Sequence, residues 1–265
     1  MTINILDEIK RDYVRDLAMH GGRTDGRAMD AFRPISVEPG VITSAEGSAR
    51  VKLGKSQVIA GIKLGVGSPF PDRPKEGVLS TNAEFLPLAS PSFESGPPSE
   101  LSIELARVVD RGIRSANAVD IASLLIDEDT EGKSKVWAVY IDLYVLDHDG
   151  NLQDAAGLAA MSAILNVQMP KYEDGKLTLE EKTGPLPSQA TAVSCTFGKI
   201  GNAILVDPSY EEEVSLDARI TMATIPGHIC ACQKTGMGSF KLEEIDSCMQ
   251  IALKKGDELR ALLKQ

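Results

Sequence analysis

The first residues of the chain show an apolar pattern with helical spacing. The apolar positions are Leu6, Ile9, Tyr13 and Leu17. Their separation of three or four positions predicts an amphipathic helix that buries this face. The helix is expected to end at Gly21 and Gly22, because glycine commonly follows the last helical turn.

From residue 34 to 66 the pattern changes to alternation of apolar and polar residues, broken by single glycines. Alternation of this kind predicts consecutive β-hairpins. Residues 67–98 are rich in Pro, Gly and Ser and predict a long loop. Long loops of this kind often carry functional residues.

A second helix is predicted after Ser99, whose side chain is suited to an N-cap. Its apolar stripe consists of Leu101, Leu105, Val108, Val109, Ile113 and Ala116. Arg107, Arg111 and Arg114 lie at i, i+4 and i+7 and are expected to share one exposed face opposite that stripe.

The second half of the chain continues with strands and helices. Residues 136–146 are almost entirely apolar or aromatic and predict a strand buried on both sides, followed by a helix of small residues over 155–165. Further strands are expected near 191–197, 203–206, 219–224 and 228–234. A final helix is predicted to be capped by Ser239, with an apolar stripe formed by Leu242, Ile245, Met249, Ala252, Leu259 and Leu263.

Strands followed by a helix in both halves predict an α+β fold of two modules with a similar plan. Pro170 marks the expected internal boundary. The predicted division is an N-terminal helix over 1–22, a first module over 23–169 and a second module over 170–265.

The composition, the N-terminal residues and the cysteine spacing exclude several classes of protein. The 265 residues are 43% hydrophobic and carry a net charge of −10, which argues against a protein that coats nucleic acid by bulk electrostatic attraction. Residues 1–20 match neither a signal peptide nor a membrane span. The four cysteines lack zinc-like spacing and are expected to be reduced, with Cys230 and Cys232 buried on one face of a strand. These features predict a cytoplasmic protein that holds no metal.

The arginine face has two interpretations. It is either a solvated surface with local ion pairs to Glu104, Asp110 and Asp120, or a surface that binds phosphates through guanidinium groups. The residues by themselves favour the first interpretation.

Five segments in fixed order carry a resemblance that covers nearly the whole chain. They are RTDGR at 23–27, PFPDRP at 69–74, ELARVVDR at 104–111, DLYVLD at 142–147 with Gly150, and VDPSYEEE at 206–213. Together they resemble the RNase PH family of phosphorolytic exoribonucleases. Within that family the chain is similar to the archaeal exosome ring subunit that pairs with the catalytic one.

The resemblance implies a fold and a set of partners. The fold would consist of duplicated RNase PH-type modules, with an N-terminal part similar to domain 2 of ribosomal protein S5 and a smaller C-terminal α+β part. The partner would be a catalytic RNase PH-like subunit, and three heterodimers would form a hexameric ring with RNA-binding cap subunits. Single-stranded RNA would be held by Arg107, Arg111 and Arg114, with Arg73 and Lys75 near the pore. Asp25 and Arg27 are expected to form a structural ion pair or turn.

Two departures from the family pattern predict that phosphorolysis has been lost. Active members present Gly, Thr or Ser, and Arg to the attacking phosphate, whereas this chain has Asn151, Leu152, Gln153 and Asp154. The acidic turn has Ser209 and Glu213 where active members carry other acidic or amide groups. We therefore expect a non-catalytic subunit without a cofactor.

Two alternatives remain open at this point. One is an active phosphate-dependent 3′–5′ exoribonuclease that uses Asp207, Glu213 and Asp217. The other is a scaffold that has no role in RNA binding.

Overall fold

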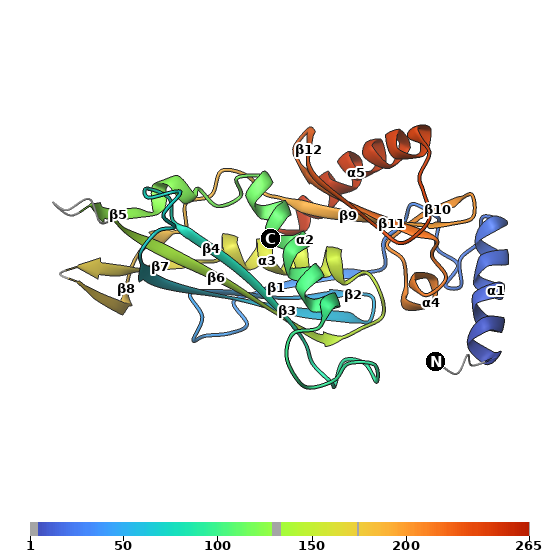
Figure 1. Cartoon of the computed structure of the whole chain (residues 1–265), viewed down its shortest axis with the longest axis horizontal. Coiled ribbons are helices and arrows are strands. Elements are labelled where there is room, and N and C mark those ends of the chain that lie inside the picture. The colour runs from blue at the N-terminus through green and yellow to red at the C-terminus, as the bar shows by residue number, and fades with distance from the viewer. Residues whose placement is uncertain (1–4, 129–133, 174, 265) are drawn as a thin grey trace.

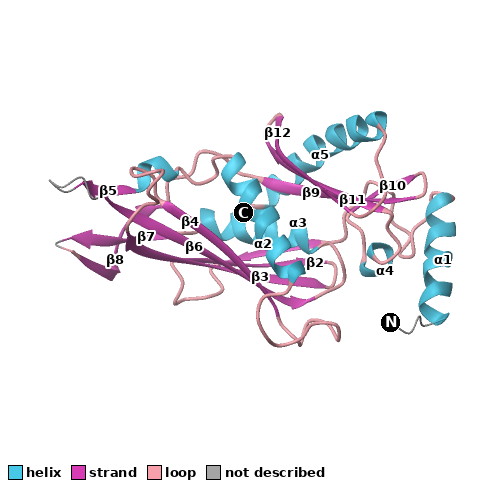
Figure 2. Cartoon of the chain, in the orientation of Figure 1, coloured by secondary structure: helices cyan, strands magenta, loops and turns pink. Residues whose placement is uncertain are grey.

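Two β-sheets with a helical layer between them form the main body of the molecule (Figures 1 and 2). The computed structural model describes residues 5–128, 134–173 and 175–264. The first sheet has the order β1 (Ile35–Pro39), β2 (Gly47–Leu53), β3 (Ser56–Gly67), β6 (Ser134–Asp147) and β4 (Val78–Phe85), with β5 (Leu125–Glu128) also paired to β6. The second has the order β10 (Ala203–Val206), β9 (Val193–Ile200), β11 (Ala218–Ile225) and β12 (His228–Thr235).

Helix α3 (Leu152–Leu165) lies between the two sheets and contacts β2, β3 and β9. It is buried over almost its whole length because both flanking layers are sheets. Helix α2 (Glu100–Ser115) packs beside α3 and against β4, and α5 (Leu242–Leu262) covers the opposite face of the second sheet. A short 3₁₀ helix, η1 (Ile121–Leu124), precedes β5.

Helix α1 (Ile5–Met19) lies at one end of the molecule beside the short helix α4 (Tyr210–Glu213) (Figure 1). Val14 and Ala18 of α1 pack with Ile200 and Leu205 of the second sheet. The predicted contact face is therefore wrong at Ile9 and Tyr13, which are exposed. The side chain of Leu6 lies outside the part of the chain that the structure describes.

The predicted hairpins of the first half are confirmed, since β1, β2 and β3 pair consecutively and antiparallel. The predicted loop over 67–98 is wrong in its centre, where β4 pairs in parallel with β6. The polar run Ser80, Thr81 and Asn82 hides this strand in the sequence, because its backbone is stabilised by pairing with a distant strand.

Strands β9 to β12 confirm the four strands predicted for the second half. An additional hairpin, β7 (Gln168–Glu173) with β8 (Lys176–Pro185), was not predicted. Its second strand is exposed along most of its length, so it lacks the apolar alternation by which a strand is recognised.

Strand β6 is buried on both faces only over Val136 to Val139. From Tyr140, which is exposed, buried and more accessible residues alternate. The expectation of a strand buried on both sides is wrong for this second part, where every second residue is exposed or only partly buried.

The Ser99 cap of α2 is confirmed, since Ser99 Oγ accepts a hydrogen bond from the Ser102 amide. Leu105, Val109 and Ile113 are buried as predicted, whereas Leu101 is exposed. The stripe therefore begins one turn later than the sequence indicated.

The final helix begins at Leu242 with Lys241 as its N-cap, so the prediction of a Ser239 cap is wrong. Leu242 and Met249 of the predicted stripe are exposed, whereas Ala252 and Leu259 of that stripe are buried as predicted, together with Cys248. Periodicity identifies a helix, but the sheet beneath it selects the buried face.

The cysteines are free thiols, and Cys195 and Cys248 are buried. Cys230 is half-buried, but Cys232 is exposed, which corrects the prediction that both pack inside.

Candidate functional site

The turn before α3 packs tightly against the segment that leads into α4. Asn151 adopts a left-handed conformation with φ 51° and ψ 47° and caps α3 through its side chain, which accepts from the Asp154 amide. Gly150 has φ +88°, and a Cβ at this position would lie 2.5 Å from the Ser209 carbonyl carbon. The Tyr210 amide donates to the Asp149 carbonyl at 3.0 Å. Two segments distant in sequence are therefore held in direct contact.

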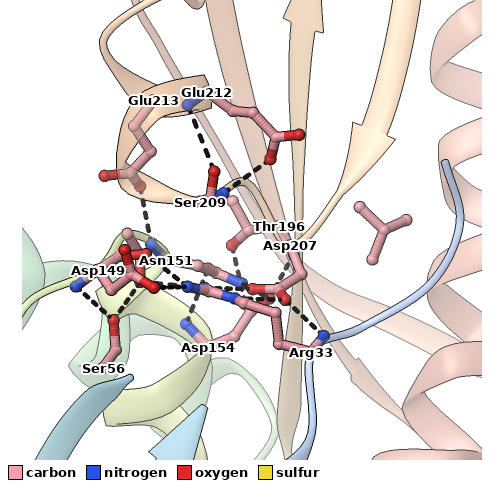
Figure 3. Close-up of polar contacts among 12 residues, drawn as sticks. Arg33, Ser56, Asp149, Asn151, Asp154, Thr196, Asp207, Ser209, Glu212 and Glu213 are labelled. Atoms are coloured by element: carbon pink, nitrogen blue, oxygen red, sulfur yellow. Dashed lines mark hydrogen bonds and ion pairs between the residues drawn. The ribbon is translucent and has the colours of Figure 1, made fainter. Parts of the chain in front are cut away.

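Asp154 is fully buried and receives three hydrogen bonds (Figure 3). The donors are Asn151 Nδ2 at 2.8 Å, the Thr196 amide at 2.9 Å and Thr196 Oγ1 at 2.7 Å. Burial raises the pKa of Asp154 to about 7, although these hydrogen bonds favour the charged form.

The side-chain amide of Asn151 contacts Asp207 as well as Asp154. Its Nδ2 donates to Asp207 Oδ1 at 2.8 Å. Arg33 pairs with Asp207 through Nε at 2.9 Å and Nη2 at 2.8 Å, and Arg27 Nη1 adds a third contact at 2.8 Å. Burial opposes ionisation, but the hydrogen bonds and charge of Arg33 outweigh it and lower the pKa of Asp207. Asp207 is therefore a structural anion that is already paired.

Glu213 closes the same network from α4 (Figure 3). Its Oε1 accepts a hydrogen bond from the backbone amide of Asn151 at 3.0 Å and another from Arg219 Nη1 at 2.9 Å. Ser209 caps α4 in a capping box with Glu212.

Glu212 is in turn paired with the buried Arg23, whose Nε donates at 2.8 Å. Asp207 and Glu212 are thus buried and Glu213 is half-buried, and protein donors already occupy each of these carboxylates.

This arrangement determines what the site can do. An anion at the start of α3 would need free amide donors and a cationic pocket. Here the Asn151 backbone amide donates to Glu213 and the Asp154 amide donates to the Asn151 side chain. The neighbouring cations Arg33 and Arg219 are already paired with Asp207 and Glu213. Leu152 and Gln153, the first two residues of α3, are both buried, and Gln153 Oε1 has no hydrogen-bond partner within the described residues.

Asp217 has different partners from Asp207 and Glu213. It pairs with Arg15 of α1 at 2.9 Å and accepts from the Gly201 amide at 2.7 Å. The three carboxylates of the enzymatic alternative are therefore held by different arginines. Among residues 5–128, 134–173 and 175–264, no group of three or more His, Cys, Asp or Glu side chains is arranged to hold a metal ion.

The arginines of α2 differ in their surroundings, so they do not form the uniform exposed face expected. Arg107 is exposed and pairs with Glu104 at 2.6 Å, and Arg114 pairs with Asp110 at 2.6 Å. Arg111 is half-buried and donates through Nη1 to Gln233 Oε1 of β12. Two of the expected local ion pairs are present, but the expected pairing with Asp120 is not among the ion pairs of the described residues.

Arg73 and Lys75 lie on the exposed loop between β3 and β4. Arg73 approaches Glu76 at 3.5 Å and Asp72 at 3.8 Å. The expected Asp25–Arg27 ion pair is confirmed, with Arg27 Nε 2.5 Å from Asp25 Oδ2.

Three residues of the network were not predicted from the sequence. Arg33 neutralises the buried Asp207, Arg219 neutralises the half-buried Glu213, and Thr196 positions Asp154. Each lies far in sequence from its partner or within an ordinary strand pattern, so no local signal identifies it.

The chain matches two family models and is similar to known proteins over nearly its whole length. A family model described as "3' exoribonuclease family, domain 1" (RNase_PH) matches residues 31–170, and the corresponding domain 2 model (RNase_PH_C) matches residues 190–255. The chain is 49% identical over 264 residues to the exosome complex component Rrp42 of Pyrococcus abyssi, and the match covers 98% of this chain and 95% of that relative.

Solved structures show the same similarity to exosome proteins. The fold is similar to a chain of the Archaeoglobus fulgidus exosome with RNA bound to the active site, with a TM-score of 0.90, 45% identity and coverage of 97% and 99% of the two chains. It is also similar to a chain of an archaeal exosome core, with a TM-score of 0.87, 42% identity and 98% coverage of both. None of the helices within the described ranges is both long enough and apolar enough to span a membrane.

Proposed function

The chain belongs to the 3′ exoribonuclease (RNase PH) family, and from this premise we propose that it is a non-catalytic ring subunit of an archaeal exosome-type complex that degrades RNA in the 3′–5′ direction. The relatives named as exosome components and the similar exosome structures support this role. The active partner is a catalytic RNase PH-like subunit, and three such heterodimers form a hexameric ring.

The closed network at the start of α3 is the observation that carries the non-catalytic assignment. Phosphorolysis needs a pocket that binds inorganic phosphate beside the scissile bond. In this chain Asp154, Asp207 and Glu213 lie in the network at the start of α3, and protein donors already occupy them. To gain a cationic contact here, a phosphate ion would have to displace Arg33 or Arg219 from its carboxylate partner.

The remaining residues support a role in holding RNA. Arg107, Arg111 and Arg114 lie on one helix beside the second sheet and supply guanidinium groups for RNA phosphates at the partner's active site. Arg73 and Lys75, on an exposed loop, line the path of the RNA. RNA-binding cap subunits and a cytoplasmic location complete the proposal.

A phosphorolysis assay tests it directly. This chain, the catalytic subunit and the purified complex are each incubated with single-stranded RNA, inorganic phosphate and a divalent metal. We expect no nucleoside diphosphate from this chain and faster release by the complex than by the catalytic subunit alone. Turnover by this chain alone, abolished by Glu213→Gln, would instead identify an active exoribonuclease.

A further inference from the structure

The three arginines of α2 are not equivalent in charge. Arg107 and Arg114 each contact a carboxylate on their own helix, Glu104 and Asp110. Each of these pairs has little net charge left to attract a phosphate. Arg111 forms no ion pair with any residue that the structure describes.

The contact of Arg111 is instead with a neutral group on another element. Gln233 Oε1 of β12 accepts from Arg111 Nη1, while Nε and Nη2 make no hydrogen bond within the described residues. A neutral acceptor orients a guanidinium without cancelling its charge. The two unused nitrogens retain the fork that binds a phosphate through two parallel hydrogen bonds.

The position of Gln233 is itself well defined. It lies opposite Thr221 in the β11–β12 register, and Thr221 Oγ1 lies 2.9 Å from Thr196 Oγ1 on β9. A cavity of about 10 Å³ separates α2 from this part of the sheet, and its lining includes Val108, Arg111, Thr221 and Gln233. Gln233 thus stands on a paired strand and holds Arg111 across the gap between helix and sheet.

We propose that Gln233 is a positioning residue that presents the uncancelled charge of Arg111 to an RNA phosphate. This inference rests on the proposed function, because the phosphate belongs to RNA bound by the assembled complex. Ordering the arginine before RNA binds lowers the entropy lost on binding. Arg111 is then the dominant contact among the three arginines.

The experiment measures RNA affinity of the purified complex across a series of salt concentrations. Gln233→Glu keeps an acceptor oxygen but neutralises Arg111. We expect about tenfold weaker binding and a slope of log K against log salt that is smaller by about 0.7, the value for one single-strand phosphate contact. Gln233→Met removes the acceptor and keeps the charge, so binding should weaken about threefold with the slope unchanged. Gln250→Glu, on the exposed side of α5, is the matched charge control.

Arg111→Ala separates this inference from the proposed function. If Arg111→Ala weakens binding but Gln233→Glu behaves like Gln250→Glu, the role of Gln233 is wrong and the proposed RNA contact stands. If Arg111→Ala also has no effect on binding, both the role of Gln233 and the proposed RNA contact of Arg111 are overturned. Adding Gln233→Glu to Arg111→Ala should cause no further loss, because the two residues act through one contact. Light scattering of each complex verifies assembly, and Gln233→Met carries the test should the charged variant fail to assemble.

Discussion

Asp154 and Asp207 both accept a hydrogen bond from the Asn151 side-chain amide, yet their pKa values shift in opposite directions. Burial dominates at Asp154, whose donors are neutral, and raises its pKa to about 7. At Asp207 the paired Arg33 outweighs burial and lowers the pKa. Each shift follows from whether a cation stands beside the carboxylate.

The shift at Asp154 predicts a pH-dependent stability. The native state binds the Asp154 proton more tightly than the unfolded chain, whose aspartates titrate near pH ~3.9. Its contribution therefore falls as pH rises from about 4 to about 7, by up to ~1.4 kcal/mol per pH unit. We expect the free energy of urea unfolding of the wild type, relative to Asp154→Asn, to decrease between pH 4.5 and 7.5.

The pairwise comparison isolates this group. Burial lowers the pKa of His148, so its contribution to the free energy of unfolding rises with pH in part of this window. This contribution is the same in the wild type and in Asp154→Asn, and it cancels in the comparison. Stabilisation by Asp207 is lost only as pH falls below about 4. Parallel pH curves for the wild type and Asp154→Asn would show that Asp154 remains ionised throughout.

At the scale of elements, the start of α3 depends on a close approach between two turns. Gly150 has a positive φ, and its α-carbon faces the backbone of Pro208, Ser209 and Tyr210. Gly227, in the turn between β11 and β12, also has a positive φ, but a Cβ added there would meet no atom within 4 Å beyond its chain neighbours. The two glycines share a left-handed backbone and differ in packing.

Alanine substitution at these two positions separates the effects. Gly227→Ala should cost ~1 kcal/mol of unfolding free energy through left-handed strain alone. Gly150→Ala should cost at least ~3 kcal/mol, because the turns must also separate. Urea unfolding of both variants measures the difference. Equal costs would mean that the turn at Gly150 relaxes without disturbing the segment that leads into α4.

The elements differ in how far local sequence predicts them. Helix α2 and its Ser99 cap follow from contiguous signals, as do strands β9 to β12. Strand β4 does not, because its stability comes from parallel pairing with β6. The apolar face of α1 is predicted wrongly, and that of α5 in part, because periodicity is nearly the same for adjacent faces of a helix that carries apolar residues on both.

At the scale of the whole molecule, a net charge of −10 repels RNA, so binding depends on local arginines and on the assembled ring. We expect this chain alone to bind single-stranded RNA with a Kd above ~10 µM at physiological salt, within the non-specific range. The complex with its catalytic subunit should bind more tightly than either component. Fluorescence anisotropy with labelled RNA measures all three, and equal affinity of the chain and the complex would contradict the shared site.

The candidate site was predictable only in part. The departure from the family pattern at Asn151 to Asp154 is visible in sequence because those four residues are contiguous. The loss of phosphorolysis at this turn, and the roles of Arg107, Arg111 and Arg114 as phosphate ligands, stay predictions. The module boundary near residue 170 likewise stays a prediction.

The helices and strands of this protein depend largely on interactions between residues a few positions apart. Apolar periodicity, side-chain caps and turn-forming glycines act within one or two turns. The sequence was therefore sufficient to predict most helices and strands and to detect the family resemblance. The electrostatics of the site arise between residues that are far apart in the chain. Arg33 and Asp207 are separated by 174 positions, and Arg111 and Gln233 by 122. Charge neutralisation, burial and pKa depend on such distances in space, and folding alone brings these partners together.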